Sequence, residues 1–164
     1  MPASSTGQSG NAAMHDRFRK PLDVLIVEDH RPICDQMADF LRRGGLSVLG
    51  SYSAEEALAV AEEYRPRVLI LDYNLPGTDG VELARQLRAS LEDAAIIMMS
   101  GRIEGISERT LAEVRINVFL NKPVPLVPLR RAVERLARAD TAGAKPAGSS
   151  AGGWLSTGLG GKRD

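Results

Sequence analysis

The chain has 164 residues, of which 43% are hydrophobic, and its 21 basic residues balance its 21 acidic residues. This length suits one well-buried domain and is short for two, while a net charge of zero argues against nucleic acid as a partner. A single cysteine, Cys34, excludes a disulfide framework and a cysteine-based metal site within the chain.

The two ends of the sequence differ from its middle. Residues 1–20 are mostly small and polar and turn basic near their end, so we expect a flexible arm there. Residues 140–164 are rich in Gly, Ala and Ser, which predicts a disordered tail. The start carries no signal pattern, and no run approaches the roughly 20 apolar residues that span a bilayer. We therefore expect a cytoplasmic protein without membrane contact, with one folded domain at residues 21–139.

Alternating strands and helices are predicted for the first half of this domain. Pro32 suits a first helical turn and Gly44 suits a helix end, while Ser53 and Glu56 have the spacing of a capping box. Pro66 is expected to separate the second helix from the strand after it. In chain order we expect a strand at 22–27, a helix at 32–43, a strand at 47–50, a helix from 53 to about 64 and a strand at 68–71.

The second half repeats the alternation. Pro76 and Gly77 signal a turn after the third strand, and Asp79 is placed to cap the helix that follows. Asn117 tolerates a left-handed conformation, which keeps the turn before the last strand feasible. The remaining elements are predicted as a strand at 95–99, a short helix at about 107–114, a strand at 118–120 and a helix with an apolar face at 126–136.

Five βα units in about 120 residues predict a parallel sheet covered by helices on both faces. Right-handed crossovers favour a flavodoxin-like doubly wound (βα)5 fold with the strand order 2-1-3-4-5. This order places the first strand beside the third, so Glu28, Asp29 and Asp72 meet at the carboxyl edge of the sheet, where ligands of such sheets bind. Carboxylates this close repel one another and need a proton or a cation between them, which predicts a site for a hard metal ion.

Four motifs fall at the ends of predicted strands, in an order that resembles the receiver domain of bacterial two-component response regulators. The resemblance covers about residues 22–139. Its motifs are Val27-Glu28-Asp29, the segment from Asp72 to Gly80, Ser100-Gly101 and Lys122-Pro123. Each motif alone is weak evidence, but together and in register with the predicted fold they identify the family. The resemblance implies a signalling switch, which catalyses only its own phosphorylation and dephosphorylation and is not otherwise an enzyme.

The resemblance implies a role for each residue of the acidic edge. Asp72 corresponds to the phosphoacceptor, whose carboxylate attacks a phosphohistidine of a sensor histidine kinase or a histidine phosphotransfer protein. Mg2+, or Mn2+ in its place, neutralises the phosphoryl charge. Lys122 pairs with a phosphoryl oxygen after transfer. The implied metal ligands are Asp29, Glu28 (directly or through water), Asp72 and the backbone carbonyl of Asn74.

Further residues correspond to the switch of this family. The hydroxyl of Ser100 meets the new phosphoryl oxygen, and Phe119 then rotates inward to fill the vacated space. This motion alters the surface of the helix near 107–114, the strand at 118–120 and the last helix, which an unknown downstream protein reads. Arg102 lies at the rim, where it is expected to lengthen the phosphorylated lifetime. The receiver is expected to be a monomer or a dimer linked to phosphorylation.

The residues alone leave other functions open. A haloacid-dehalogenase-like phosphatase also forms an aspartyl phosphate, but it needs a second acid two residues after the nucleophile, where this chain has Asn74. A nucleotide-binding domain is disfavoured because no phosphate-binding glycine motif follows a predicted strand. As a receiver, the chain is expected to act as a stand-alone regulator, and the alternatives are the receiver module of a hybrid kinase and an inert interaction module.

Overall fold

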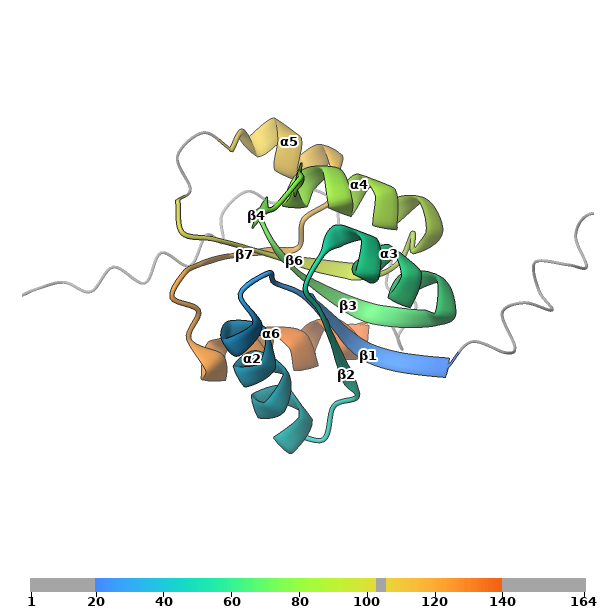
Figure 1. Cartoon of the computed structure of the whole chain (residues 1–164), viewed down its shortest axis with the longest axis vertical. Helices are drawn as coiled ribbons and strands as arrows, with labels where there is room; N and C mark the ends of the chain where they lie inside the picture. The colour runs from blue at the N-terminus through green and yellow to red at the C-terminus, as the bar shows by residue number, and fades with distance from the viewer. Residues whose placement is uncertain (1–19, 103–105, 140–164) are drawn as a thin grey trace, which may run out of the picture.

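A computed structural model describes residues 20–102 and 106–139 of the chain. They form a five-stranded sheet between two layers of helices (Figure 1). The strands of this sheet are β1 (Lys20–Val27), β2 (Val48–Ser51), β3 (Tyr64–Asp72), β6 (Ala95–Ser100) and β7 (Val118–Asn121). The helices are α2 (Arg31–Arg43), α3 (Ala54–Glu63), α4 (Gly80–Ser90), α5 (Glu108–Glu113) and α6 (Leu126–Ala139).

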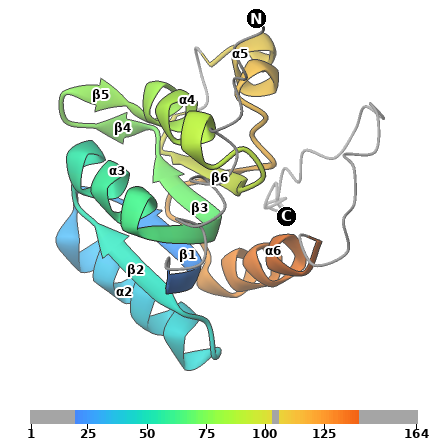
Figure 2. The ribbon, with the colours of Figure 1, turned by 90° about the vertical axis from the view of Figure 1, so that its right-hand side faces the viewer.

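The strands lie in the order β2-β1-β3-β6-β7, and every neighbouring pair is parallel. Counted along the chain this is the order 2-1-3-4-5, so the predicted flavodoxin-like doubly wound fold is confirmed. Helices α3, α4 and α5 cover one face of the sheet, and α2 and α6 cover the other (Figure 1). A separate hairpin of β4 (Asn74–Leu75) and β5 (Thr78–Asp79) extends between β3 and α4 (Figure 2).

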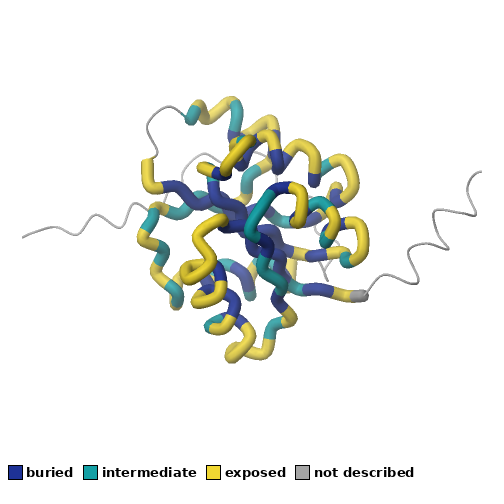
Figure 3. The backbone as a smooth tube through the Cα atoms, in the orientation of Figure 1, coloured by how far each residue is buried: buried dark blue, intermediate teal, exposed yellow. Residues whose placement is uncertain are grey.

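Both faces of the sheet are buried, which explains why its strands are continuous apolar runs in the sequence. Leu25 and Leu69 pack in the layer of α3 and α4, whereas Val24 and Ile70 pack in the layer of α2 and α6. The buried strands run through the middle of the molecule, and exposed residues gather on the outer sides of the helices (Figure 3). Close packing on both faces holds the strand ends, and therefore the residues that follow them, in fixed positions.

Two predicted helix caps are confirmed. The Ser53 Oγ accepts a hydrogen bond from the Glu56 N–H at 3.2 Å at the start of α3. Asp79 accepts one from the Glu82 N–H at 2.8 Å at the start of α4. The carboxylate of Glu56 reaches back to the N–H of Tyr52 at 2.8 Å, one residue before the partner that a capping box uses.

Two turns differ from the prediction. Strand β3 begins at Tyr64 and contains Pro66, because the residue before a proline favours extended backbone and the helix has already ended. The left-handed residue before β7 is Arg115, with a φ of 55°, and it is not Asn117. Asn117 instead starts the pairing of β7 with β6: its backbone N–H donates to the Ile96 carbonyl at 2.9 Å, and its Oδ1 accepts from the Ile96 N–H at 2.8 Å.

The arm predicted for residues 1–20 and the tail predicted for residues 140–164 lie outside the described residues, except for Lys20 at the start of β1. Within residues 20–102 and 106–139, no helix combines the length and the apolar content that crossing a bilayer requires.

Candidate functional site

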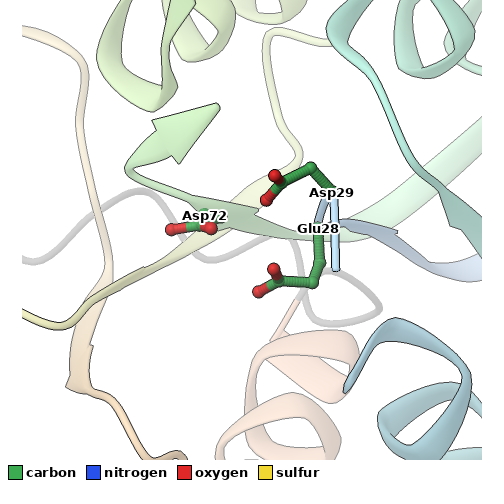
Figure 4. Close-up of side chains that lie close together, drawn as sticks. All are labelled: Glu28, Asp29 and Asp72. Atoms are coloured by element: carbon green, nitrogen blue, oxygen red, sulfur yellow. The ribbon is translucent and has the colours of Figure 1, made fainter. Parts of the chain in front are cut away.

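The carboxyl ends of β1 and β3 bring three carboxylates together. Glu28 and Asp29 follow β1 directly, and Asp72 is the last residue of β3, the neighbouring strand. One carboxylate oxygen from each residue lies within 4.8 Å of the other two (Figure 4). The cluster depends on the parallel pairing of β1 with β3, which aligns their carboxyl ends at one edge of the sheet.

Burial makes two of these charges costly unless they are paired. Glu28 is 1% exposed and Asp72 is 3% exposed, whereas Asp29 is open to solvent. Lys122, which follows β7, places its Nζ 2.6 Å from Oε2 of Glu28 and 2.8 Å from Oδ2 of Asp72. One ammonium therefore bridges both buried carboxylates and offsets much of the cost of their desolvation.

The bridge keeps Lys122 charged. Burial lowers the pKa of its ammonium, but the hydrogen bonds to Asp72 and Glu28 and the negative charges of these carboxylates together outweigh burial, so the pKa lies above the ordinary value of 10.5. A raised pKa means that folding favours the protonated form. The stability contributed by Lys122 is therefore fully present below pH 10.5 and is lost as the pH rises through the higher pKa of the folded state.

The remaining carboxylate oxygens suit a hard cation. Oε1 of Glu28 accepts a hydrogen bond from the His30 N–H, and Oδ1 of Asp72 accepts one from the Asn74 N–H, both at 3.1 Å. Asp29 is exposed and makes no hydrogen bond or ion pair with another described residue. Each carboxylate oxygen offers further lone pairs, and Mg2+ binds one or two carboxylates while keeping several waters. The residues present therefore fit Mg2+.

Gly80, the last residue of the motif that begins at Asp72, is also part of the site. Its N–H donates to the Tyr73 carbonyl at 2.8 Å, which folds the start of α4 back onto the end of β3. A Cβ at this position would collide with the carbonyl oxygen of Asp72 and would lie 2.9 Å from Met98 Sδ. Only glycine permits this approach. Glycine has a poor helix propensity, so a glycine at the first position of a predicted helix is the sequence signal for such a close approach.

The hydroxyl of Ser100 is held by its own loop. Ser100 is fully buried at the end of β6, and its Oγ donates to the Arg102 carbonyl at 2.7 Å and accepts from the Arg102 N–H at 3.1 Å. The Ser100 carbonyl accepts from the Lys122 N–H at 2.9 Å, so the backbone of Ser100 adjoins the acidic cluster. In this conformation the hydroxyl makes no hydrogen bond to Asp72.

The other predicted switch residues lie outside the cluster. Phe119 is half-buried in β7, pairs in register with Met98 of β6 and packs against the core on the side of α3 and α4. Arg102 is exposed. The structure thus gathers the carboxylates of Glu28, Asp29 and Asp72 and pairs Lys122 with two of them. It places the switch residues on the adjoining strands β6 and β7 and just after β6.

Residues 24–134 match the family model of the response regulator receiver domain. The phosphate regulon transcriptional regulatory protein PhoB of Pseudomonas aeruginosa is 34% identical over 102 residues, which are 61% of this chain and 44% of that protein. The response regulator MprA of Mycolicibacterium vanbaalenii is 32% identical over 122 residues, 74% of this chain and 52% of that protein. The chain therefore spans about half the length of these curated relatives.

Solved structures agree with the family match. A CheY-like receiver domain from Methanospirillum hungatei superposes with a TM-score of 0.68 at 25% identity, covering 76% of this chain and 99% of that structure. A response regulator from Chloroflexus aurantiacus gives 0.64 at 29% identity, covering 73% and 99%. Proteins of this family are signalling switches that histidine kinases phosphorylate on aspartate, generally with Mg2+ at an acidic site. With its sheet order, its acidic cluster and a match over residues 24–134, the chain belongs to the response regulator receiver domain family.

Proposed function

We propose that this receiver accepts a phosphoryl group on Asp72 from a sensor histidine kinase or a histidine phosphotransfer protein. The observation that carries the proposal is the bridge from Lys122 to Asp72 and Glu28, which places a cation beside a buried carboxylate. An oxygen of Asp72 forms the new P–O bond as the P–N bond of the phosphohistidine breaks, and the electron pair of the broken bond stays on the imidazole nitrogen. Lys122 then pairs with a phosphoryl oxygen.

The same proposal assigns the metal ligands. Asp29, Glu28, Asp72 and the backbone carbonyl of Asn74 are the groups that would hold Mg2+ or Mn2+, and the ion supplies charge neutralisation for the transferred phosphoryl group. The exposure of Asp29 supports its assignment, because an exposed carboxylate beside two buried ones is available to a cation from solvent. The free and buried thiol of Cys34 fits a reducing compartment, so we place the reaction in the cytoplasm.

The output is proposed to be a change in the surface formed by α5, β7 and α6. Ser100 must exchange its hydrogen bonds with Arg102 for one with a phosphoryl oxygen, which releases Arg102. Phe119 then moves into the vacated space. Val127 at the start of α6 is an apolar residue that is 47% exposed, and we propose that it contributes to the surface that a downstream protein contacts. We propose that the receiver acts there as a stand-alone regulator; its use as a module of a hybrid kinase is the alternative.

A small phosphodonor tests the reaction. Incubation with acetyl phosphate and Mg2+ is expected to add the mass of one phosphoryl group, which hydroxylamine removes because it attacks acyl phosphates. Asp72→Asn should abolish the addition, whereas Asp39→Asn, at an exposed carboxylate on α2, should not. The proposal fails if Asp72→Asn is still labelled, and steady release of phosphate from varied monoesters would point to a phosphatase.

Arg102→Ala is expected to shorten the phosphorylated lifetime, measured by the same mass assay after the donor is removed.

A further inference from the structure

Helix α5 depends on its neighbours for its position. It has six residues, Glu108–Glu113, of which only Leu111 is buried, and Val114 at its C-cap is buried as well. A helix this short is unstable alone, so tertiary contacts decide where it lies. Because α5 is part of the proposed output surface, these contacts also decide how that surface responds.

The C-terminal end of α5 has an unusual left-handed residue. The Ile116 N–H donates to the Leu111 carbonyl at 3.0 Å and the Arg115 N–H donates to the Ala112 carbonyl at 3.1 Å, which is the Schellman pattern. Glycine normally occupies the left-handed position of this motif, but here Arg115 has a φ of 55°. A residue with a side chain costs roughly 1 kcal/mol or more there, so further interactions must hold it.

Arg88 supplies the first of these interactions. Its Nη2 donates to the carbonyls of Val114 at 3.4 Å and Arg115 at 3.2 Å. Its Nη1 binds carbonyls of the turn that links α4 to β6, namely those of Leu91, Glu92 and Ala94. Among the described residues Arg88 has no carboxylate partner. Its charge instead faces the carbonyl ends of two helices, α4 and α5, where the helix dipoles favour a cation.

Arg115 supplies the second interaction in the opposite direction. Its own guanidinium donates to the Glu92 carbonyl at 3.2 Å, in the turn that Arg88 also binds. Arg88 and Arg115 thus both connect the turn after α4 with the turn after α5, one from each side. Among the described residues a further polar contact between α4 and α5, the exposed ion pair of Arg85 with Glu113 at 3.8 Å, also lies at this end. Among the described residues, the polar contacts between the two helices are therefore confined to residues 113–115 of the α5 end.

We propose that Arg88 and Arg115 form a reciprocal clamp that fixes the C-terminal end of α5 on α4, so that α5 turns about this end when Asp72 is phosphorylated. Arg88 is then a positioning residue of the switch. The proposal rests on the proposed function of Asp72 for the motion, but the clamp itself is a property of the unphosphorylated protein. At the other end, Ser107 makes local bonds with Thr110 and accepts the Leu111 N–H at its carbonyl, so among the described residues no bond comparable to the clamp joins this end to α4.

Amide hydrogen exchange measured by NMR tests the clamp. In the natural chain we expect the amides of Arg115 and Ile116 to keep the same protection before and after phosphorylation with acetyl phosphate, while that of Leu111 changes. In Arg88→Gln, protection of Arg115 and Ile116 should fall about tenfold, because bonds from a charged donor are lost, and should become sensitive to phosphorylation. The rate of labelling at Asp72 should stay within about twofold, since Arg88 does not touch the acidic cluster.

Arg85→Gln is the matched control. Arg85 lies one turn earlier on α4 and binds only exposed carboxylates, so its loss should leave the protection of Arg115 and Ile116 unchanged. If Arg88→Gln does not fold, Arg115→Asn is the second variant. Asparagine tolerates the left-handed conformation, so this change removes only the bond from residue 115 to the Glu92 carbonyl. The protection of the Ile116 amide is then expected to fall about threefold.

Unchanged protection of Arg115 and Ile116 in the clamp variants would overturn the clamp. Equal changes at Ile116 and Leu111 in the natural chain on phosphorylation would overturn the pivot about this end of α5. If mass spectrometry shows no phosphoryl group on Asp72, the proposed function fails and the pivot fails with it. Loss of protection in the unphosphorylated Arg88→Gln protein would even then establish the clamp separately.

Discussion

At the scale of the residue, the site is governed by one ammonium group. Lys122 bonds two carboxylates that are almost fully buried, and a third carboxylate, Asp29, lies beside them without an ion-pair partner among the described residues. The resting site thus carries an excess of negative charge, which attracts a divalent cation. Lys122 and the cation share the same carboxylates, so each weakens the attraction that the other feels.

Replacing Lys122 separates its stabilisation of the buried carboxylates from its competition with the cation. Lys122→Met should lower the free energy of unfolding by about 1–3 kcal/mol without metal, because Glu28 and Asp72 lose their cation. It should also tighten Mg2+ binding several-fold, since a competing positive charge is gone. Thermal unfolding across a Mg2+ titration measures both. Arg43→Met, at an exposed arginine of α2, is the control, and an unchanged Mg2+ affinity in Lys122→Met would contradict the electrostatic argument.

Cys34 should be inert in the folded protein. Burial, with the negative charges of Asp35 and Glu28, raises the pKa of its thiol from 9.0 to about 12. Iodoacetamide at pH 8 should therefore modify the chain in urea but not under native conditions, as mass spectrometry would show. Between pH 9.0 and about 12 the unfolded thiol loses its proton while the folded one keeps it, so stability should fall as the pH rises through this window. Equal rates of iodoacetamide labelling in the native and the urea-unfolded protein would contradict the expected inertness of the Cys34 thiol.

At the scale of the element, the join between β3 and α4 determines the position of Asp72. Residue 80 must lie against the backbone of Asp72 and Tyr73 for α4 to begin where it does. The cap by Asp79 and the turn at Gly77, with a φ of 80°, fix the intervening hairpin. The cap and the turn were readable as local signals. The glycine at residue 80 signalled a close approach, but the sequence did not show which backbone it approaches, because that depends on the tertiary structure.

Gly80→Ala should displace this join. The added Cβ meets backbone atoms, which cannot rotate away, so we expect a loss of about 1–3 kcal/mol in unfolding free energy. Labelling of Asp72 by acetyl phosphate should also slow, because its carboxylate shifts relative to Lys122. Gly101→Ala is the control for stability, since a Cβ there meets nothing within 4 Å. Urea unfolding compares the two, and equal midpoints would show that the join is not restrictive.

At the scale of the whole molecule, the strand order gathers residues far apart in the sequence. Glu28 and Lys122 are separated by 94 positions, yet they follow β1 and β7 at the same edge of the sheet. Two apolar layers hold this edge, one on each face. The chemistry at the edge therefore depends on both layers, and α6 completes one of them.

A fragment of residues 20–139 is expected to carry the whole domain. Its unfolding free energy should match that of the full chain within about 1 kcal/mol, because both apolar layers lie within it. A fragment that ends at residue 125 removes α6 with Leu129 and Val133, which exposes apolar residues of β1 and β3, so it should not unfold cooperatively. Urea unfolding followed by circular dichroism checks both. A full chain more stable by several kcal/mol would place part of the domain outside these residues.

The sequence by itself predicted the main strands and helices, their order, and the three carboxylates that meet at the edge of the sheet. Apolar runs that end in Glu28 and Asp72 predicted buried parallel strands, and the caps at Ser53 and Asp79 were correct because capping is a local interaction. Only the tertiary structure showed that Lys122 binds Glu28 as well as Asp72, that Ser100 is engaged with its own loop, and that Arg115 is the left-handed residue. Each of these depends on distances between segments that are not adjacent, or on side-chain competition for partners, and neither has a periodic or local signal in the sequence.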